Sequence, residues 1–207
     1  MYKQIIKRIL DMILSILMLP FVVLATFLIS LFIWADDRHS PFYISLRTGK
    51  NAKPFRMYKF RTMKVNAPDV RNPDGSTFNA EDDPRVTRIG RLLRRTSIDE
   101  LPQIFNVLKG EMSFVGPRPT MVDTTLNPIK EYETGRFSVR PGVTGYSQAF
   151  FRNSISQDEK FANDDYYANN VTLILDIRIF LKTILSVLSQ KNINSDLSME
   201  NENQERK

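Results

Sequence analysis

A single run of hydrophobic residues dominates the first part of the chain. The twenty-two residues from Ile13 to Trp34 contain no charged side chain, and a helix needs about 20 mostly apolar residues to cross the hydrocarbon core of a bilayer. The run is longer than the apolar core of a secretory signal peptide, and the sequence at its end, FIWADD, is a poor small-residue cleavage site. The pattern therefore favours a membrane-inserted helix over a cleaved signal peptide.

Two shapes of this membrane segment stay open from the residues alone. Pro20 removes a backbone donor inside the run and predicts a kink or break there. Positive residues flank both ends, so the charges lack the asymmetry that orients a spanning helix. The segment is either a plain span or a re-entrant helical hairpin that turns at Pro20 and returns to the same side of the bilayer. The flanking positive residues are Lys3, Lys7, Arg8, Arg38, Arg47, Lys50 and Lys53.

The pattern changes to that of short strands after the apolar run. Residues 42–63 carry β-type residues on either side of Thr48-Gly49-Lys50-Asn51, which predicts a β-hairpin. Residues 65–83 are rich in Asn, Asp, Pro and Gly and predict a loop. Two prolines keep residues 113–120 from being helical throughout.

Apolar residues recur at helical spacing in three later segments. Val86–Arg95 and Ile98–Leu108 are predicted helices, the second with Gly110 as its C-cap. Val171–Ser189 predicts an amphipathic helix, which either covers a core or lies in a membrane interface. Its apolar face carries Leu173, Ile177, Phe180, Leu181, Ile184 and Leu188. The tail from Lys191 has few apolar residues and is predicted to be disordered.

Composition narrows the chemistry before any motif is considered. The chain has no cysteine, which excludes disulfides, thiolate nucleophiles and sulfur-ligated zinc. Its one histidine, His39, excludes a histidine-rich metal site and is interpreted as a surface residue. The net charge of +6 suits an anionic partner. Any catalysis is therefore expected to depend mostly on carboxylates together with Lys and Arg, with Tyr as a further candidate.

Two adjacent carboxylates, Asp99 and Glu100, follow a segment that is dense in arginine. They have a structural interpretation, because Ser97 and Glu100 have the spacing of a capping box and acidic residues suit the first turn of a helix. They also have a functional one, because a carboxylate among arginines can attack phosphorus when cations screen the repulsion between two anions. The metal for such a site would be a hard ion, Mg²⁺. The arginines are Arg85, Arg88, Arg91, Arg94 and Arg95.

Two further groups of cations point to a phosphate site. Lys59 and Arg61 are two residues apart in a predicted strand, so both should project from one face toward one place. Arg118 lies between Pro117 and Pro119, which stiffen the backbone around one guanidinium. Each group alone is a weak signal, and together they strengthen the functional interpretation.

These segments together resemble a known family. The chain contains KFRTM at 59–63, DPRVTRIGRLLRRTSIDELPQIFNVLKGEMSFVGPRP at 83–119, RPGVTGYSQ at 140–148 and DDYYANNVTLILDIRIFLKTI at 164–184. In this order, after an apolar N-terminus interrupted by proline, they resemble the monotopic phosphoglycosyl transferases, also called the bacterial sugar transferase family. The resemblance covers most of residues 1–190.

The resemblance implies a fold and a place in the cell. It implies an α+β protein: a small, mostly helical cytosolic domain with a short β-hairpin, a re-entrant membrane hairpin that turns at Pro20, and interfacial amphipathic helices. The expected parts are a membrane helix at 1–36, a catalytic domain at 37–190 and a polar tail at 191–207. The expected location is the cytoplasmic face of the inner membrane, with a homodimer left open.

The resemblance also implies a reaction. Such enzymes transfer a sugar 1-phosphate from a UDP-sugar to polyprenol phosphate, with Mg²⁺, and release UMP. Asp99 would be the nucleophile of a ping-pong mechanism through a covalent phosphosugar, and Glu100 would hold the metal or handle a proton. The expected substrate-binding residues are Lys59, Arg61, Arg88, Arg118, Tyr146, Gln148, Arg152 and Asp164. Leu19 replaces the serine that often precedes the turn proline, and GYSQAFFR replaces GWAQVNGR, which leaves the sugar open.

Two other classes of protein stay open beside the enzyme. One is a membrane-anchored protein whose arginines hold nucleic acid or anionic lipid. Nucleic acid is not expected as a partner, because Val86–Arg95 has no aromatic residue interleaved with its cations. The other is a scaffold subunit of a polysaccharide assembly complex that keeps the fold without activity. The presence of Asp99, Glu100 and Arg118 argues against the scaffold.

Overall fold

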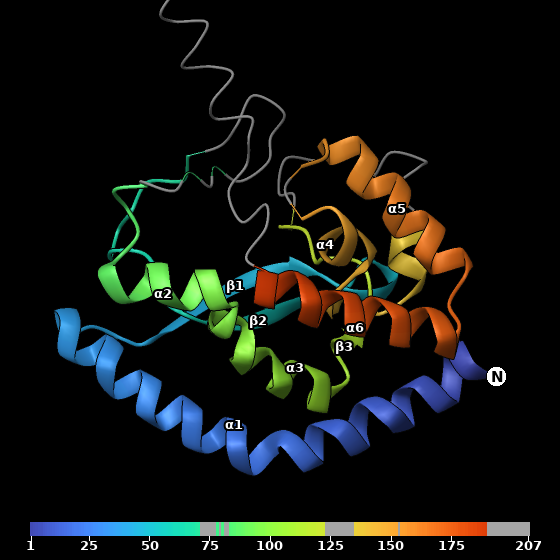
Figure 1. The fold of residues 1–207 in the computed structure, drawn as a ribbon, viewed down its shortest axis with the longest axis horizontal. Helices are drawn as coiled ribbons and strands as arrows, with labels where there is room; N and C mark the ends of the chain where they lie inside the picture. Colours follow the sequence, from blue (N-terminus) through green and yellow to red (C-terminus); the bar gives the residue numbers. More distant parts are fainter. Residues whose placement is uncertain (71–77, 79, 81–82, 123–134, 153, 190–207) are drawn as a thin grey trace, which may run out of the picture.

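The computed structural model describes residues 1–70, 78, 80, 83–122, 135–152 and 154–189. The predicted polar tail and part of the predicted loop at 65–83 lie outside these residues. Within them the chain is α+β, with a bent N-terminal helix along one side and the remaining elements packed inside its bend (Figure 1).

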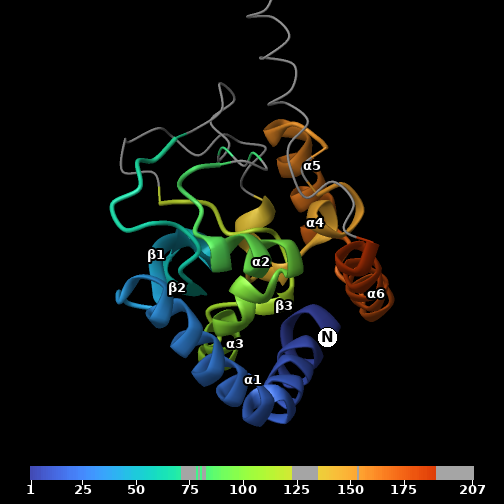
Figure 2. The same cartoon turned by 60° about the vertical axis from the view of Figure 1, so that its left-hand side comes forward.

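The apolar N-terminal run forms one long helix. A π-helical turn, η1 (Tyr2–Ile6), leads into α1 (Lys7–Asp37), which contains Pro20. The helix bends near its middle in both views (Figures 1 and 2), as expected where a proline interrupts the hydrogen-bond ladder. Most of its large apolar side chains are exposed. Among the described residues, Tyr2–Asp37 is the one helix long and apolar enough to cross a membrane.

Both ends of α1 are attached to the rest of the molecule. Near the N-terminus, Tyr2 and Lys7 contact the Asp176 carboxylate at 2.5 and 2.6 Å. At the other end, the Asp37 carboxylate accepts two hydrogen bonds from the Arg61 guanidinium, each 2.6 Å long. The two arms of the bent helix therefore return to one globular body.

The predicted β-hairpin is confirmed. Strands β1 (Phe42–Thr48) and β2 (Pro54–Phe60) pair antiparallel, with Phe42 opposite Phe60 and Thr48 opposite Pro54. The connection runs from Gly49 to Lys53 and includes the short 3₁₀ turn η2 (Lys50–Ala52). A second, parallel pair joins β3 (Ser113–Val115) to β4 (Gly142–Thr144).

The helices follow the predicted segments with one change. The first is α2 (Arg88–Thr96), whose N-cap Thr87 accepts a hydrogen bond from the Gly90 amide at 2.9 Å. The second predicted helix is split into the 3₁₀ helix η3 (Ile98–Gln103) and α3 (Ile104–Lys109). Pro102 explains the split, because a proline cannot donate within a regular α-helix. Gly110, with φ of 83°, closes α3 as predicted.

In the described residues of the C-terminal part, four helical elements join the β3–β4 pair. These are η5 (Gly135–Ser138), α4 (Tyr146–Phe150), α5 (Gln157–Asn169) and the predicted amphipathic helix, α6 (Leu173–Ser189). Val115, Ala149, Tyr167 and Ile179 form their common core. Two smaller clusters pack β2 against α3 and against α1 and α2. The packing fixes the start of η3 between β2 and α2.

Candidate active site

The adjacent carboxylates lie where two helices meet. Ser97 adopts a left-handed conformation, with φ of 57°, and its amide donates to the Arg94 carbonyl at 3.1 Å to close α2. The same residue begins η3, so Asp99 and Glu100 lie in the first turn of that helix. The sharp change of direction at Ser97 separates the carboxylates from the arginine-rich helix that precedes them.

The predicted capping box is wrong. The Ser97 side chain makes no capping hydrogen bond, and the Glu100 amide instead donates to the Ser97 carbonyl at 3.3 Å. A capping box needs an N-cap residue in the extended region, and Ser97 cannot adopt it while it closes α2. The Glu100 carboxylate is thus free to turn toward the hairpin.

Glu100 is held by two cations. Its Oε1 accepts a hydrogen bond from Lys59 Nζ at 2.7 Å and lies 3.4 Å from the Arg118 guanidinium. The Glu100 side chain is 17% exposed. Burial alone would raise the pKa of Glu100, but Lys59 and Arg118 outweigh it and lower the pKa below its usual value. Glu100 is therefore a stable anion that orients both cations.

The pKa of Asp99 is shifted in the opposite direction to that of Glu100. Burial raises its pKa to about 6; Lys59, Arg118 and Arg94 oppose that rise, whereas the charge of Glu100 adds to it. No hydrogen bond reaches the Asp99 carboxylate from any residue that the structure describes. An unengaged, half-buried carboxylate among three cations can act as a nucleophile toward an anionic phosphate.

A pocket opens beside Glu100, the member of the dyad that lines it. Lys59 and Arg118, the two cations that contact Glu100, also line this pocket. Gln103, whose side-chain amide is buried, lines it as well and is 2% exposed. Gln103 follows Glu100 by one turn of the 3₁₀ helix, where side chains three apart align. The remaining lining residues are Arg47, Met57, Pro119, Gly142 and Val143.

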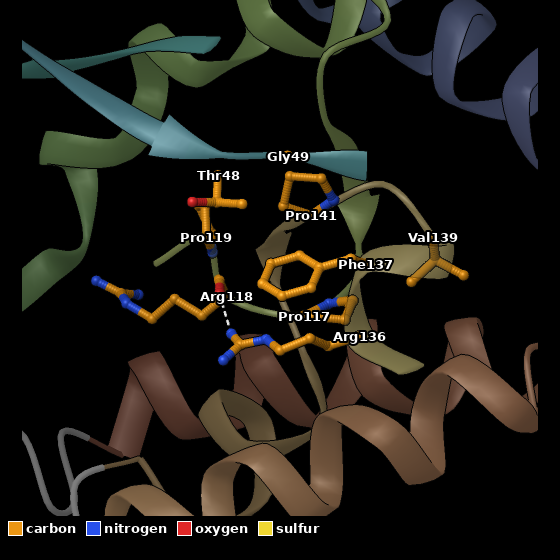
Figure 3. Close-up of a pocket in the computed structure, with 9 residues that line it drawn as sticks. All are labelled: Thr48, Gly49, Pro117, Arg118, Pro119, Arg136, Phe137, Val139 and Pro141. Atoms are coloured by element: carbon orange, nitrogen blue, oxygen red, sulfur yellow. Dashed lines mark hydrogen bonds between the residues drawn. The ribbon is translucent and has the colours of Figure 1, made fainter. Parts of the chain in front are cut away.

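A second, adjoining pocket shares Arg118 (Figure 3). Pro117, Pro119 and Pro141 form much of its wall, together with Phe137 and Arg136. The Arg136 guanidinium points to the main chain of Arg118 and donates to its carbonyl at 2.6 Å.

The prediction that Lys59 and Arg61 aim at one place is wrong. Lys59 reaches Glu100, whereas Arg61, just after the end of β2, binds Asp37 and the Ser40 carbonyl. The Arg61 guanidinium thereby joins the end of α1 to the hairpin. Arg88 is exposed at the start of α2 and makes no ion pair within the described part of the chain.

Three other predicted substrate-binding residues, Tyr146, Gln148 and Arg152, lie in or just after α4. Tyr146 packs against Phe150, 4.8 Å between ring centroids, and against Tyr166. Gln148 has a buried Oε1 without a hydrogen-bond partner in the described ranges, and burial lowers the pKa of Arg152. Across the residues with described positions, no hydrogen bond or ion pair joins these three to the dyad.

Asp164 is engaged in a buried ion pair. Its Oδ2 lies 3.0 Å from the Arg136 guanidinium, and both side chains are at most 5% exposed. Burial raises the pKa of Asp164 to about 7, against the opposing charges of Arg136 and Arg118. Most of this carboxylate is therefore buried and cannot contact a substrate directly.

Sequence reasoning missed three residues of the site. Arg94, near enough to lower the pKa of Asp99, stood out only as one of five arginines. Gln103 and Arg136 carried no local signal, because their importance comes from residues distant along the chain.

A hard cation is the metal that the dyad fits. The described residues contain no group of three or more Asp, Glu or His side chains that could hold a metal. Mg²⁺ needs only one or two carboxylates when substrate phosphates complete its coordination. Asp99 keeps its oxygens unengaged, and Glu100 has Oε2 beside the oxygen that its cations occupy. The dyad therefore fits Mg²⁺ bound jointly with a substrate.

Comparisons with known proteins give the family. Residues 2–190 match the family described as bacterial sugar transferase. The chain is 42% identical to the uncharacterized sugar transferase EpsL of Bacillus subtilis, covering 92% of this chain and 91% of that protein. It is 36% identical to the undecaprenyl-phosphate galactose phosphotransferase of Salmonella typhimurium, covering 90% of this chain and 41% of that protein.

A third relative carries a different sugar in its name. The undecaprenyl-phosphate N-acetylgalactosaminephosphotransferase of Aeromonas hydrophila is 38% identical, over 89% of this chain and 44% of its own length. The chain spans less than half of the Salmonella and Aeromonas proteins and nearly all of the Bacillus one. On these matches the protein belongs to the bacterial sugar transferase family of enzymes, as its sequence motifs predicted.

Proposed function

We propose that this protein transfers a sugar 1-phosphate from a UDP-sugar to polyprenol phosphate. In the first step a carboxylate oxygen of Asp99 bonds to the β-phosphorus, and the bond between that phosphorus and the bridging oxygen breaks, so UMP leaves. In the second step a phosphate oxygen of the lipid bonds to the same phosphorus, and the bond between that phosphorus and the Asp99 oxygen breaks. The Asp99 carboxylate is then restored and polyprenyl diphosphate sugar is formed.

The observation that carries this proposal is the contrast inside the dyad. The pKa of Asp99 is raised and its carboxylate accepts no hydrogen bond from the described residues, whereas its neighbour Glu100 contacts Lys59 and Arg118. A nucleophile needs a free oxygen, and the phosphate that it attacks needs fixed cations around it. Lys59, Arg94 and Arg118 supply those cations, and Glu100 orients two of them. The pocket beside them gives the diphosphate a place to bind.

Divalent metal completes the proposal. Asp99 and Glu100 would hold Mg²⁺ together with the diphosphate, where the ion would neutralise charge that develops on the phosphate oxygens.

The relatives support the class of substrate but not the sugar. The Salmonella protein is named for galactose and undecaprenyl phosphate, and the Aeromonas protein for N-acetylgalactosamine and the same lipid. We therefore propose undecaprenyl phosphate as the acceptor, and UDP-galactose and UDP-N-acetylgalactosamine as the first donors to test.

The activity is tested by UMP release from these donors in the presence of undecaprenyl phosphate. Asp99→Asn should reduce release by about 1,000-fold or more, because the nucleophile is removed while the shape of the side chain is kept. EDTA should stop the reaction, and added Mg²⁺ should restore it. Thermal unfolding of the variant serves as the control for folding. Undiminished release by Asp99→Asn would exclude the covalent mechanism, and a protein that binds the donor without releasing UMP would be a scaffold.

We further propose that α1 enters the membrane and returns to the cytoplasmic side of the inner membrane. Its exposed apolar surface, its bend and the attachment of both ends to one globular body support this topology. A spanning helix would leave its ends on opposite sides. Because the chain has no cysteine, single cysteines at Tyr2 and Ser40 can be labelled with an impermeant reagent. Labelling from the same side is expected, and labelling from opposite sides would show a span.

A further inference from the structure

The Arg118 side chain has few contacts that could hold it in place. Its side chain is 56% exposed, and its contact with Glu100 is 3.4 Å long. An exposed arginine loses considerable rotamer entropy when it is held in one position. The main chain beneath it sets where the side chain starts, and so which region the guanidinium can reach.

The main chain around Arg118 is held through its carbonyl groups. Pro117 and Pro119 have no amide hydrogen to donate. The Pro117 carbonyl accepts from the Gly142 amide at 2.9 Å, and the Thr120 carbonyl accepts from the Thr48 amide at 3.0 Å. Between them, the Arg118 carbonyl accepts from the Arg136 guanidinium at 2.6 Å (Figure 3). Arg136 thus supplies the central one of three attachments.

Arg136 is itself fixed on several sides. Its side chain is 3% exposed and pairs with Asp164. The ring of Phe161 lies 4.4 Å from its guanidinium carbon. Burying an arginine and an aspartate together costs desolvation energy, so such a pair is weak evidence for stability. A charged donor does form a shorter and stronger hydrogen bond to a carbonyl than a neutral one.

We propose that Arg136, held by Asp164, is a positioning residue that fixes the Arg118 main chain and through it the guanidinium at the phosphate site. This inference rests on the proposed function for the role of that guanidinium. It gives Asp164 a different task from the substrate contact that the sequence suggested. Asp164 orients Arg136, which in turn orients the residue beside the dyad.

Hydrogen exchange tests the placement without using activity. Arg136→Lys keeps a positive charge near Asp164 but loses the planar fork that reaches the Arg118 carbonyl. We expect about tenfold faster exchange of the Thr48 and Gly142 amides, which bind the neighbouring carbonyls. Asp164→Asn, a milder change, should show the same effect to a smaller degree and serves if Arg136→Lys does not fold. Unchanged exchange in the folded variants would overturn the proposal.

Arg85→Lys is a matched control. Arg85 is a buried arginine that pairs with Asp83 at 2.6 Å and donates to the Pro68 carbonyl at 2.8 Å, without a contact to Arg118. The same substitution there should leave exchange at Thr48 and Gly142 unchanged. Equal acceleration by Arg85→Lys would show a general loss of stability and would contradict a positioning role.

A double-mutant cycle on UMP release then tests whether Arg136 acts through Arg118. Arg136→Lys should lower kcat/KM about tenfold in the native chain but less than about twofold in an Arg118→Ala background. An equal loss in both backgrounds would overturn the inference. If the native protein releases no UMP, the proposed function fails, while the exchange experiment still decides whether Arg136 fixes this segment.

Discussion

Asp99 and Asp164 are two carboxylates in similar surroundings with different engagement. Burial is the main cause of a raised pKa in both, to about 6 for Asp99 and about 7 for Asp164, and Arg118 opposes the rise in both. Asp164 pairs directly with Arg136. Asp99 has cations around it but accepts no hydrogen bond from the described residues.

The difference shows that burial and nearby charge do not by themselves identify a reactive carboxylate. Both properties are common to the two residues, and the pKa of Asp164 is raised further than that of Asp99. Engagement separates them: Asp164 pairs with a buried arginine through Oδ2, whereas Asp99 accepts no hydrogen bond from the described residues and directly precedes Glu100, which lines a pocket. The local reason is the turn at Ser97, which places Asp99 half-buried in the first turn of a short helix, whereas Asp164 is buried inside α5.

Trapping the covalent intermediate should show the largest difference between Asp99 and Asp164. Incubation with a UDP-sugar labelled on the β-phosphate, without lipid acceptor, should attach label to the peptide that contains Asp99. The label should be released by hydroxylamine, as expected for an acyl phosphate, and should be absent in Asp99→Asn. Asp164→Asn should still be labelled, though more slowly, because Asp164 is proposed to position Arg118 and not to carry the covalent bond. Label on the Asp164 peptide would reverse the two roles.

The pH dependence of kcat/KM should report the ionisation of Asp99. The acidic limb should have its midpoint near pH 6, because Asp99 must be ionised to attack. Glu100→Gln removes a negative charge that raises the pKa of Asp99, so the limb should move to lower pH. Lys59→Met removes a positive charge that lowers this pKa, so the limb should move to higher pH. Shifts of up to about one unit are expected, and shifts of the same sign would contradict the assignment.

The smallest expected effect is on stability. The folded pKa of Asp164 is raised, so the folded chain binds more protons than the unfolded chain between about pH 4 and 7. The contribution of Asp164 to the free energy of unfolding is therefore complete below pH 4 and is lost as the pH rises through 7. The Tm of Asp164→Asn minus that of the native chain should therefore rise by a few °C from pH 4 to pH 7.

Asp83→Asn is the control for that measurement. Its hydrogen bond with Arg85 lowers the pKa of Asp83, so the contribution of Asp83 is lost only as the pH falls below about 4. The Tm difference for this variant should be flat between pH 4 and 7. A parallel trend in the two variants would mean that Asp164 is not the group that titrates.

The sequence predicted what depends on neighbouring residues. The β-hairpin, the C-cap at Gly110 and the amphipathic helix α6 follow from local patterns, and all three are confirmed. The capping box failed because Ser97 also ends the preceding helix. The dyad was found from its motif, and Lys59 reaches Glu100.

What sequence reasoning missed depends on contacts between distant residues. Arg61 and Asp37 are 24 positions apart, and their pairing is decided by where α1 ends against the hairpin. Arg136 meets Arg118 across 18 positions. No periodicity or spacing reports such meetings, because they follow from packing of the whole chain.

The attachment of both ends of α1 has a consequence for its length. Each residue added to an α-helix turns everything beyond it by about 100° and moves it by about 1.5 Å. One insertion between Lys7 and Asp37 would therefore point one of these side chains away from its partner, even if the added residue were as apolar as its neighbours. The number of residues in this helix is set by angular phase as well as by hydrophobicity, so evolution can exchange its side chains far more freely than it can add or remove one.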